Sequence, residues 1–71
     1  MSSAIAQETE LEMVRRHIRE GAGHLARQRF LIARMRMDGI STEEAETLLA
    51  TLEDNHRQHE AQLARIVGVG R

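Results

Sequence analysis

The sequence predicts an all-α fold, namely an antiparallel, coiled-coil-like helical hairpin that dimerises into a four-helix bundle. Two long segments carry seam residues at alternating steps of three and four, which is the period of packed helices. One short break with strong turn signals separates them. The chain has 71 residues and no cysteine, so it buries a marginal core alone and cannot add disulfides. Its size therefore favours association with a second chain.

The first helix is expected over about residues 9–38. Thr9 and Glu12 have the spacing of a capping box, in which each side chain bonds the backbone N–H of the other residue. Asp38 and Gly39 form a stop signal, because glycine readily adopts the left-handed conformation that ends many helices. The signals at the two ends agree on one long helix.

The second helix is expected over about residues 42–67, where Ser41 and Glu44 repeat the capping-box spacing. The turn of residues 39–41 is so short that the two helices must fold back antiparallel. Residues 1–8 are expected to be a flexible leader, and residues 68–71 a frayed tail.

Each helix carries its own seam of core-facing residues. In the first helix these are Leu11, Val14, Ile18, Gly21, Leu25, Gln28, Ile32 and Met35. In the second they are Ala45, Leu49, Leu52, His56, His59, Leu63 and Ile66. The short turn implies that facing residues have numbers summing to about 80. Leu25 is then expected opposite His56, and Gly21 opposite His59.

Charged residues beside the seam provide a separate prediction of the same register. Arginines recur at seven-residue spacing on one side of the first helix, and glutamates recur similarly on the second. An antiparallel pair would place Arg36 beside Glu46 and Arg29 beside Glu53. Exposed ion pairs contribute little stability, so their value here is in specifying the register.

A second apolar line lies on the side of the first helix opposite the seam. Burying Phe30 or Met37 of this line would contribute roughly 1.5–3 kcal/mol each. The predicted surface for a second chain comprises Ala26, Phe30, Leu31, Ala33, Met37 and Leu48. A homodimer is the favoured occupant of this surface. A helix of a different protein, held in a groove, is the alternative that the sequence leaves open.

The histidines raise the question of a metal site. His24, His56, His59 and Glu60 are the candidate ligands, and nitrogen ligands suit zinc or nickel. The competing interpretation, which we favour, is that His56 and His59 form a polar layer in the core. We therefore expect no metal and no cofactor. Whether this layer is structural, pH-sensing or metal-binding stays open at this stage.

Composition argues against several classes of function. The chain has no cysteine or tyrosine, no phosphate-binding glycine loop and no expected pocket, so we expect no enzyme. Arg16, Arg27 and Arg34 are the candidates for nucleic-acid contact. Ten basic residues are balanced by eleven acidic ones and there is one aromatic, which argues against nucleic acid as a partner. No apolar run reaches membrane-spanning length, so we expect a cytoplasmic protein without a membrane partner.

Part of the chain resembles a group of known proteins. The matching residues are His24-Leu25-Ala26-Arg27-Gln28-Arg29, Asp38-Gly39, Thr42, Ala45, Leu48-Leu49 and His59. They resemble short helical-hairpin proteins and tails of proteobacteria, some of which are appended to signalling proteins. The layout, but no motif, is also similar to the Rop-type dimeric four-helix bundle.

The hairpin resemblance implies an interaction or regulatory role. Together with the composition and the second apolar surface, it favours a non-catalytic module that acts through protein–protein contacts. The alternatives are a Rop-like nucleic-acid-binding dimer and a histidine-based metal-binding bundle.

Overall fold

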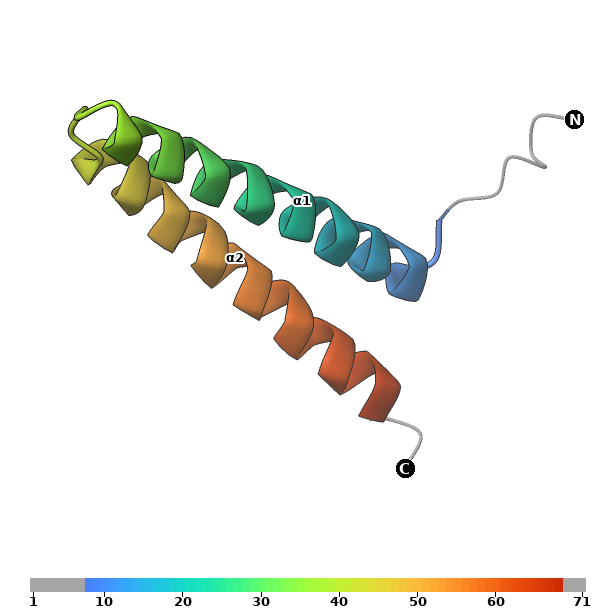
Figure 1. Cartoon of the computed structure of the whole chain (residues 1–71). Coiled ribbons are helices and arrows are strands. Elements are labelled where there is room, and N and C mark those ends of the chain that lie inside the picture. Colours follow the sequence, from blue (N-terminus) through green and yellow to red (C-terminus); the bar gives the residue numbers. More distant parts are fainter. Residues whose placement is uncertain (1–7, 69–71) are drawn as a thin grey trace, which may run out of the picture.

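The chain folds into two antiparallel helices joined by a short turn, which confirms the predicted fold class. A computed structural model describes residues 8–68, with α1 over Glu10–Met37 and α2 over Glu43–Gly68. The helices run side by side from the turn and diverge toward their other ends (Figure 1). Of the predicted leader and tail, only Glu8 and Gly68 lie within the described residues.

The start of α1 has the capping box that its sequence predicts. The Thr9 hydroxyl accepts a hydrogen bond from the backbone N–H of Glu12 at 3.0 Å, and the Glu12 carboxylate accepts one from the backbone N–H of Thr9 at 3.0 Å. These bonds satisfy backbone donors that the first helical turn leaves without partners. Glu10 and Glu12 also place negative charge at the positive end of the helix dipole.

The end of α1 is a Schellman motif centred on Gly39. This glycine has a φ of 71°, which confirms the predicted left-handed conformation. The N–H of Ile40 donates to the carbonyl of Met35 at 2.9 Å, and the N–H of Gly39 donates to the carbonyl of Arg36 at 3.1 Å. The motif satisfies the last carbonyls of α1 and reverses the chain direction.

The start of α2 differs from its prediction. The Ser41 hydroxyl accepts from the backbone N–H of Glu43 at 3.5 Å, rather than from that of Glu44. Thr42 precedes the first helical residue, and its hydroxyl donates to the carboxylate of Glu46. The expected Ser41–Glu44 box is therefore wrong by one residue. Adjacent serine and threonine can both serve as caps, and Thr42 has an acceptor one turn further on.

The predicted seams lie between the two helices. Val14, Leu25 and Ile32 of α1 are buried, and the remaining seam residues of both helices are partly buried. Within the described residues α2 contributes no fully buried side chain. The core of the hairpin is thus a single thin layer, as expected where two helices have no third element against them.

The ion pairs predicted across the seam are present. Arg36 contacts Glu46 at 3.0 Å, and Arg29 contacts Glu53 at 3.3 Å. Both pairs are largely exposed, so their main effect is on register. They confirm which side of α1 adjoins which side of α2.

The pairing of the seam histidines differs from the prediction. His56 lies so close to Gly21 that a methyl group added at this glycine would come within 2.7 Å of the Nδ1 atom of the ring. His59 instead approaches His17, with 4.9 Å between ring centroids. The expected pairing of Gly21 with His59 is therefore wrong by about one helical turn. Arginine side chains are long enough to span one helical turn. The predicted ion pairs can therefore form despite this axial offset of one turn, whereas directly packed seam residues change partners.

Candidate interaction surfaces

The seam has two edges of different chemistry. Neighbouring residues on a helix are rotated by about 100°, so Arg29 and Arg36 flank one edge of the seam, and Gln28 and Leu31 flank the other. The first, which we call the charged edge, is crossed by the two ion pairs to Glu53 and Glu46. It holds a shallow hollow of about 240 Å³ lined by Arg29, Ile32, Arg36, Glu46, Leu49, Ala50 and Glu53. The ion pairs span this edge from within the chain.

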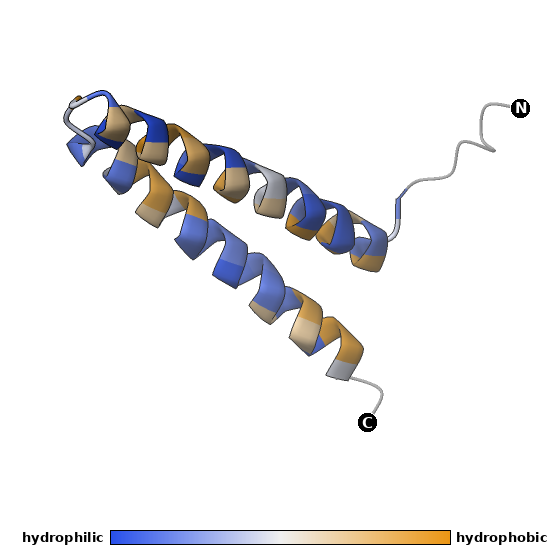
Figure 2. Cartoon of the chain, viewed as in Figure 1, coloured by the Kyte–Doolittle hydropathy of each residue, from blue (hydrophilic) through white to orange (hydrophobic). Residues whose placement is uncertain are grey.

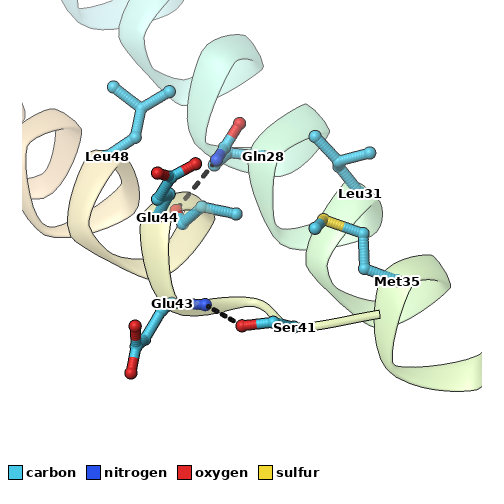
Figure 3. A pocket seen from close by; sticks show the side chains of 8 residues that line it. Gln28, Leu31, Met35, Ser41, Glu43, Glu44 and Leu48 are labelled. Carbon is cyan, nitrogen blue, oxygen red and sulfur yellow. Dashed lines mark hydrogen bonds between the residues drawn. The ribbon is translucent and has the colours of Figure 1, made fainter. Parts of the chain in front are cut away.

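The other edge, which we call the open edge, is apolar near the turn. It holds a pocket of about 530 Å³ lined by Gln28, Leu31, Met35, Ser41, Glu43, Glu44, Ala45 and Leu48. Figure 3 shows Leu31 and Met35 of α1 and Leu48 of α2 around this pocket. Leu31 is 48% exposed and Leu48 is 49% exposed. Both leucines belong to the surface that the sequence predicts for a second chain, and the structure places them around one pocket.

One cross-helix hydrogen bond holds the apolar end of the open edge together. The Nε2 atom of Gln28 donates to the backbone carbonyl of Ala45 at 2.9 Å, and this contact is partly buried (Figure 3). Since Ala45 lies in the first turns of α2, the bond ties that helix directly to the middle of α1. Gln28 therefore connects the two helices of the hairpin by a hydrogen bond.

Away from the turn the open edge becomes polar but remains nearly uncharged. Seven-residue steps from Leu31 lead to His24 and His17, and the same steps from Leu48 lead to Asn55 and Gln62. The Gln62 amide donates to Glu10 at 3.3 Å, which shows that the two lines adjoin at that end. In Figure 2, the middle of α2 is hydrophilic, and the helix becomes hydrophobic again toward its C-terminal end.

A third surface lies on the outer face of α1. Phe30 is 64% exposed and Met37 is 81% exposed, and Ala26 and Ala33, one turn before each of them, are also exposed. We call these four residues the outer stripe. No other part of residues 8–68 covers it, as the sequence pattern predicts for a lone hairpin.

The structure brings two of the four candidate metal ligands into contact. The Nε2 atom of His56 lies 3.4 Å from a carboxylate oxygen of Glu60. His59 packs on His17 instead, and His24 is exposed with its Nδ1 atom 2.8 Å from Arg27. Residues 8–68 contain no cluster of three or more ligand side chains able to hold a metal ion.

Among the described seam residues, His56 is the one with a buried side-chain polar atom that lacks a hydrogen-bond partner. Its side chain is 16% exposed, and its Nδ1 atom is buried without a hydrogen-bond partner among the described residues. Buried polar atoms without partners are rare because each costs desolvation free energy. This nitrogen faces Gly21, so the absence of a side chain there makes room for the ring.

The arginines proposed for nucleic-acid contact differ in their surroundings. Arg16 donates two hydrogen bonds to Glu8, at 2.9 and 3.0 Å, and a third to Glu20 at 3.4 Å. The hydrogen bonds that Arg16 donates to Glu8 lower the pKa of the Glu8 carboxyl and raise the pKa of the Arg16 guanidinium. The charge of Arg16 is thus compensated within the chain. Arg27 contacts His24, and Arg34 is exposed.

Comparison of the chain with protein-family models, with curated proteins and with solved structures gives no match. Of the resemblances drawn from the sequence, the structure supports the two-helix hairpin architecture. Within residues 8–68, neither helix combines the length and apolar character needed to cross a membrane.

Proposed function

We propose that this chain is a non-catalytic interaction module that acts through protein–protein contacts, with a second copy of itself as the first partner. The observation that carries the proposal is the exposure of large apolar side chains at the open edge and the outer stripe. Among residues 8–68, three hydrophobic residues are buried in the core, whereas six large hydrophobic residues are exposed.

A second chain would cover part of this exposed apolar surface. Fully burying a leucine, methionine or phenylalanine side chain contributes roughly 1.5–3 kcal/mol. A chain of this length has little other means of stabilisation, since it has no cysteine. Two hairpins packed as a four-helix bundle would enclose a core with apolar side chains from four helices rather than two.

The experiment that tests the proposal is the solution mass and stability of the untagged protein over a wide concentration range. A dimer would have a mass of twice 8.1 kDa by size-exclusion chromatography with light scattering. Its urea midpoint would also rise with protein concentration, because association stabilises the folded state by mass action. A folded monomer with a midpoint independent of concentration would contradict self-association.

A further inference from the structure

We propose that the second copy docks on the open edge with both turns at the same end, so that α1 of each copy lies beside α2 of the other. This inference rests on the self-association proposed above and specifies its face and its direction. Two observations carry it: the opposite charges of the two helices and the change from apolar to polar along the open edge.

The choice of face follows from the difference between the two edges. Covering the charged edge would remove Arg29, Glu53, Arg36 and Glu46 from water, and burying ion pairs carries a desolvation penalty that often exceeds their attraction. The open edge instead offers a pocket of about 530 Å³ between Leu31 and Leu48. Its charged rim residues are Glu43 and Glu44, which can remain at the border of an interface.

Two hairpins that meet face to face by a two-fold axis have two possible directions. If the axis runs along the bundle, the turns lie together and each α1 adjoins the α2 of the other copy. If the axis crosses the bundle, the turns lie apart and each α1 adjoins the other α1. Neighbouring helices are antiparallel in both, so direction depends on which side chains meet.

The charges favour the arrangement with the turns together. Seven arginines and three glutamates lie within α1, for a net charge of +4. Two arginines and six acidic residues lie within α2, for a net charge of −4. With the turns together, each basic helix adjoins an acidic one. With the turns apart, like-charged helices adjoin, which is unfavourable in a close pair.

The chemistry along the open edge favours the same direction. With the turns together, the apolar end around Leu31 and Leu48 packs against the apolar end of the second copy. With the turns apart, Leu31 would lie near His17 of the second copy, because the two residues are about equally far from the middle of α1. Leu48 would likewise lie near the second copy's Gln62, which would bury apolar side chains against polar ones.

This arrangement leaves the outer stripe on the outside of the dimer. Phe30 and Met37 lie on the face of α1 turned away from the seam, so a second hairpin on the open edge does not reach them. The homodimer and the outer stripe are then separate features of the molecule.

Spin–spin distance measurement tests the direction. The chain has no cysteine, so Asp38→Cys, at an exposed position beside the turn and outside the open-edge pocket, provides one labelling site per chain. Turns that lie together at helix spacings of about 8–10 Å predict a label separation below about 25 Å. Turns that lie apart predict about 40 Å, the length of a helix of this size. A dimer with the long separation would overturn the inference while leaving self-association intact.

Paired surface variants test the face. Leu31→Asp with Leu48→Asp is expected to weaken dimerisation by on the order of a hundredfold, since it places charge in the interface. The matched control is Phe30→Asp with Met37→Asp, which is expected to change the dissociation constant of the dimer by less than about threefold. All four positions are exposed, so helicity by circular dichroism should remain. Loss of the dimer in the second variant alone would overturn the inference, and a monomeric wild type would overturn the proposed function as well.

Discussion

At the residue scale, one contact between the helices depends on a missing side chain. Gly21 is a poor helix former by intrinsic propensity, yet it lies within α1 directly against His56. Gly23, two residues further on, faces much more open surroundings, with the flexible end of Arg27 as its nearest neighbour at 3.8 Å. The same residue type therefore has a packing role at one position and none at the other.

Replacing these two glycines by alanine should have opposite effects. Gly23→Ala is expected to stabilise the protein by about 0.5–1 kcal/mol, which is the usual gain in helix propensity. Gly21→Ala places a methyl group 2.7 Å from the His56 ring, so we expect a loss of about 1 kcal/mol through overpacking. The measurement is the free energy of unfolding in urea.

The His56→Ala background provides the control for this pair of variants. With the ring removed, Gly21→Ala should become stabilising, as Gly23→Ala is. Equal stabilisation by both alanines in the unaltered chain would show that Gly21 has no packing role.

At the scale of the elements, α2 is tied to the hairpin by interactions in its first turns. Glu46 accepts hydrogen bonds from the Thr42 hydroxyl and from Arg36 of α1. One carboxylate thereby links the residue before α2 to its first turn and bridges to α1. Its bond from Thr42 and its contact with Arg36 lower the pKa of the Glu46 carboxyl.

This lowered pKa predicts a loss of stability in acid. The unfolded chain, with a glutamate pKa of about 4.3, binds the proton more readily than the folded chain does. The stabilisation from Glu46 is therefore complete above that value and is lost as the pH falls through the folded pKa. Urea midpoints measured from about pH 5 down to about pH 3 should fall less steeply in Glu46→Gln than in the wild type.

Glu43→Gln is the matched control because it removes a carboxylate from the same turn of α2 without touching the bridge. Its midpoints should keep the wild-type dependence on pH. A Glu46→Gln variant with an unchanged slope would contradict the role assigned to the bridge.

At the scale of the whole molecule, stability is divided between a thin core and surfaces that a second chain can cover. Leu25 is 6% exposed between the helices, whereas the larger Phe30 side chain lies on the outer stripe. In a dimer formed through the open edge, Leu25 remains a core residue and Phe30 remains in water. The smaller residue, Leu25, is then expected to contribute more to stability than the larger residue, Phe30.

Alanine substitution should reveal that inversion. Leu25→Ala is expected to lower the free energy of unfolding by about 2–5 kcal/mol, because it leaves a cavity in the core. Phe30→Ala removes more atoms but is expected to change stability by less than about 0.5 kcal/mol. The measurement is urea unfolding of both variants at one protein concentration. A large effect of Phe30→Ala would mean that the outer stripe is covered in the purified dimer.

The sequence alone determined the helices, the turn at Gly39, the seam residues and the partners in the ion pairs. These features depend on local spacing and on the constant geometry of the α-helix, which one chain specifies without reference to its neighbours. The apolar character of the outer stripe and of Leu31 and Leu48 was readable for the same reason.

The tertiary structure decided where the helices lie along each other. It placed His56 on Gly21 and His59 on His17. The sequence left this open, because each helix has a seam residue in every turn and several axial offsets therefore bring seam residues together. It also distinguished the charged edge from the open edge, since the ion pairs span one side of the seam and the other side is lined by Leu31 and Leu48. A shift of one helix along the other by a single turn changes which side chains meet, and the packing of the whole molecule determines which shift is adopted.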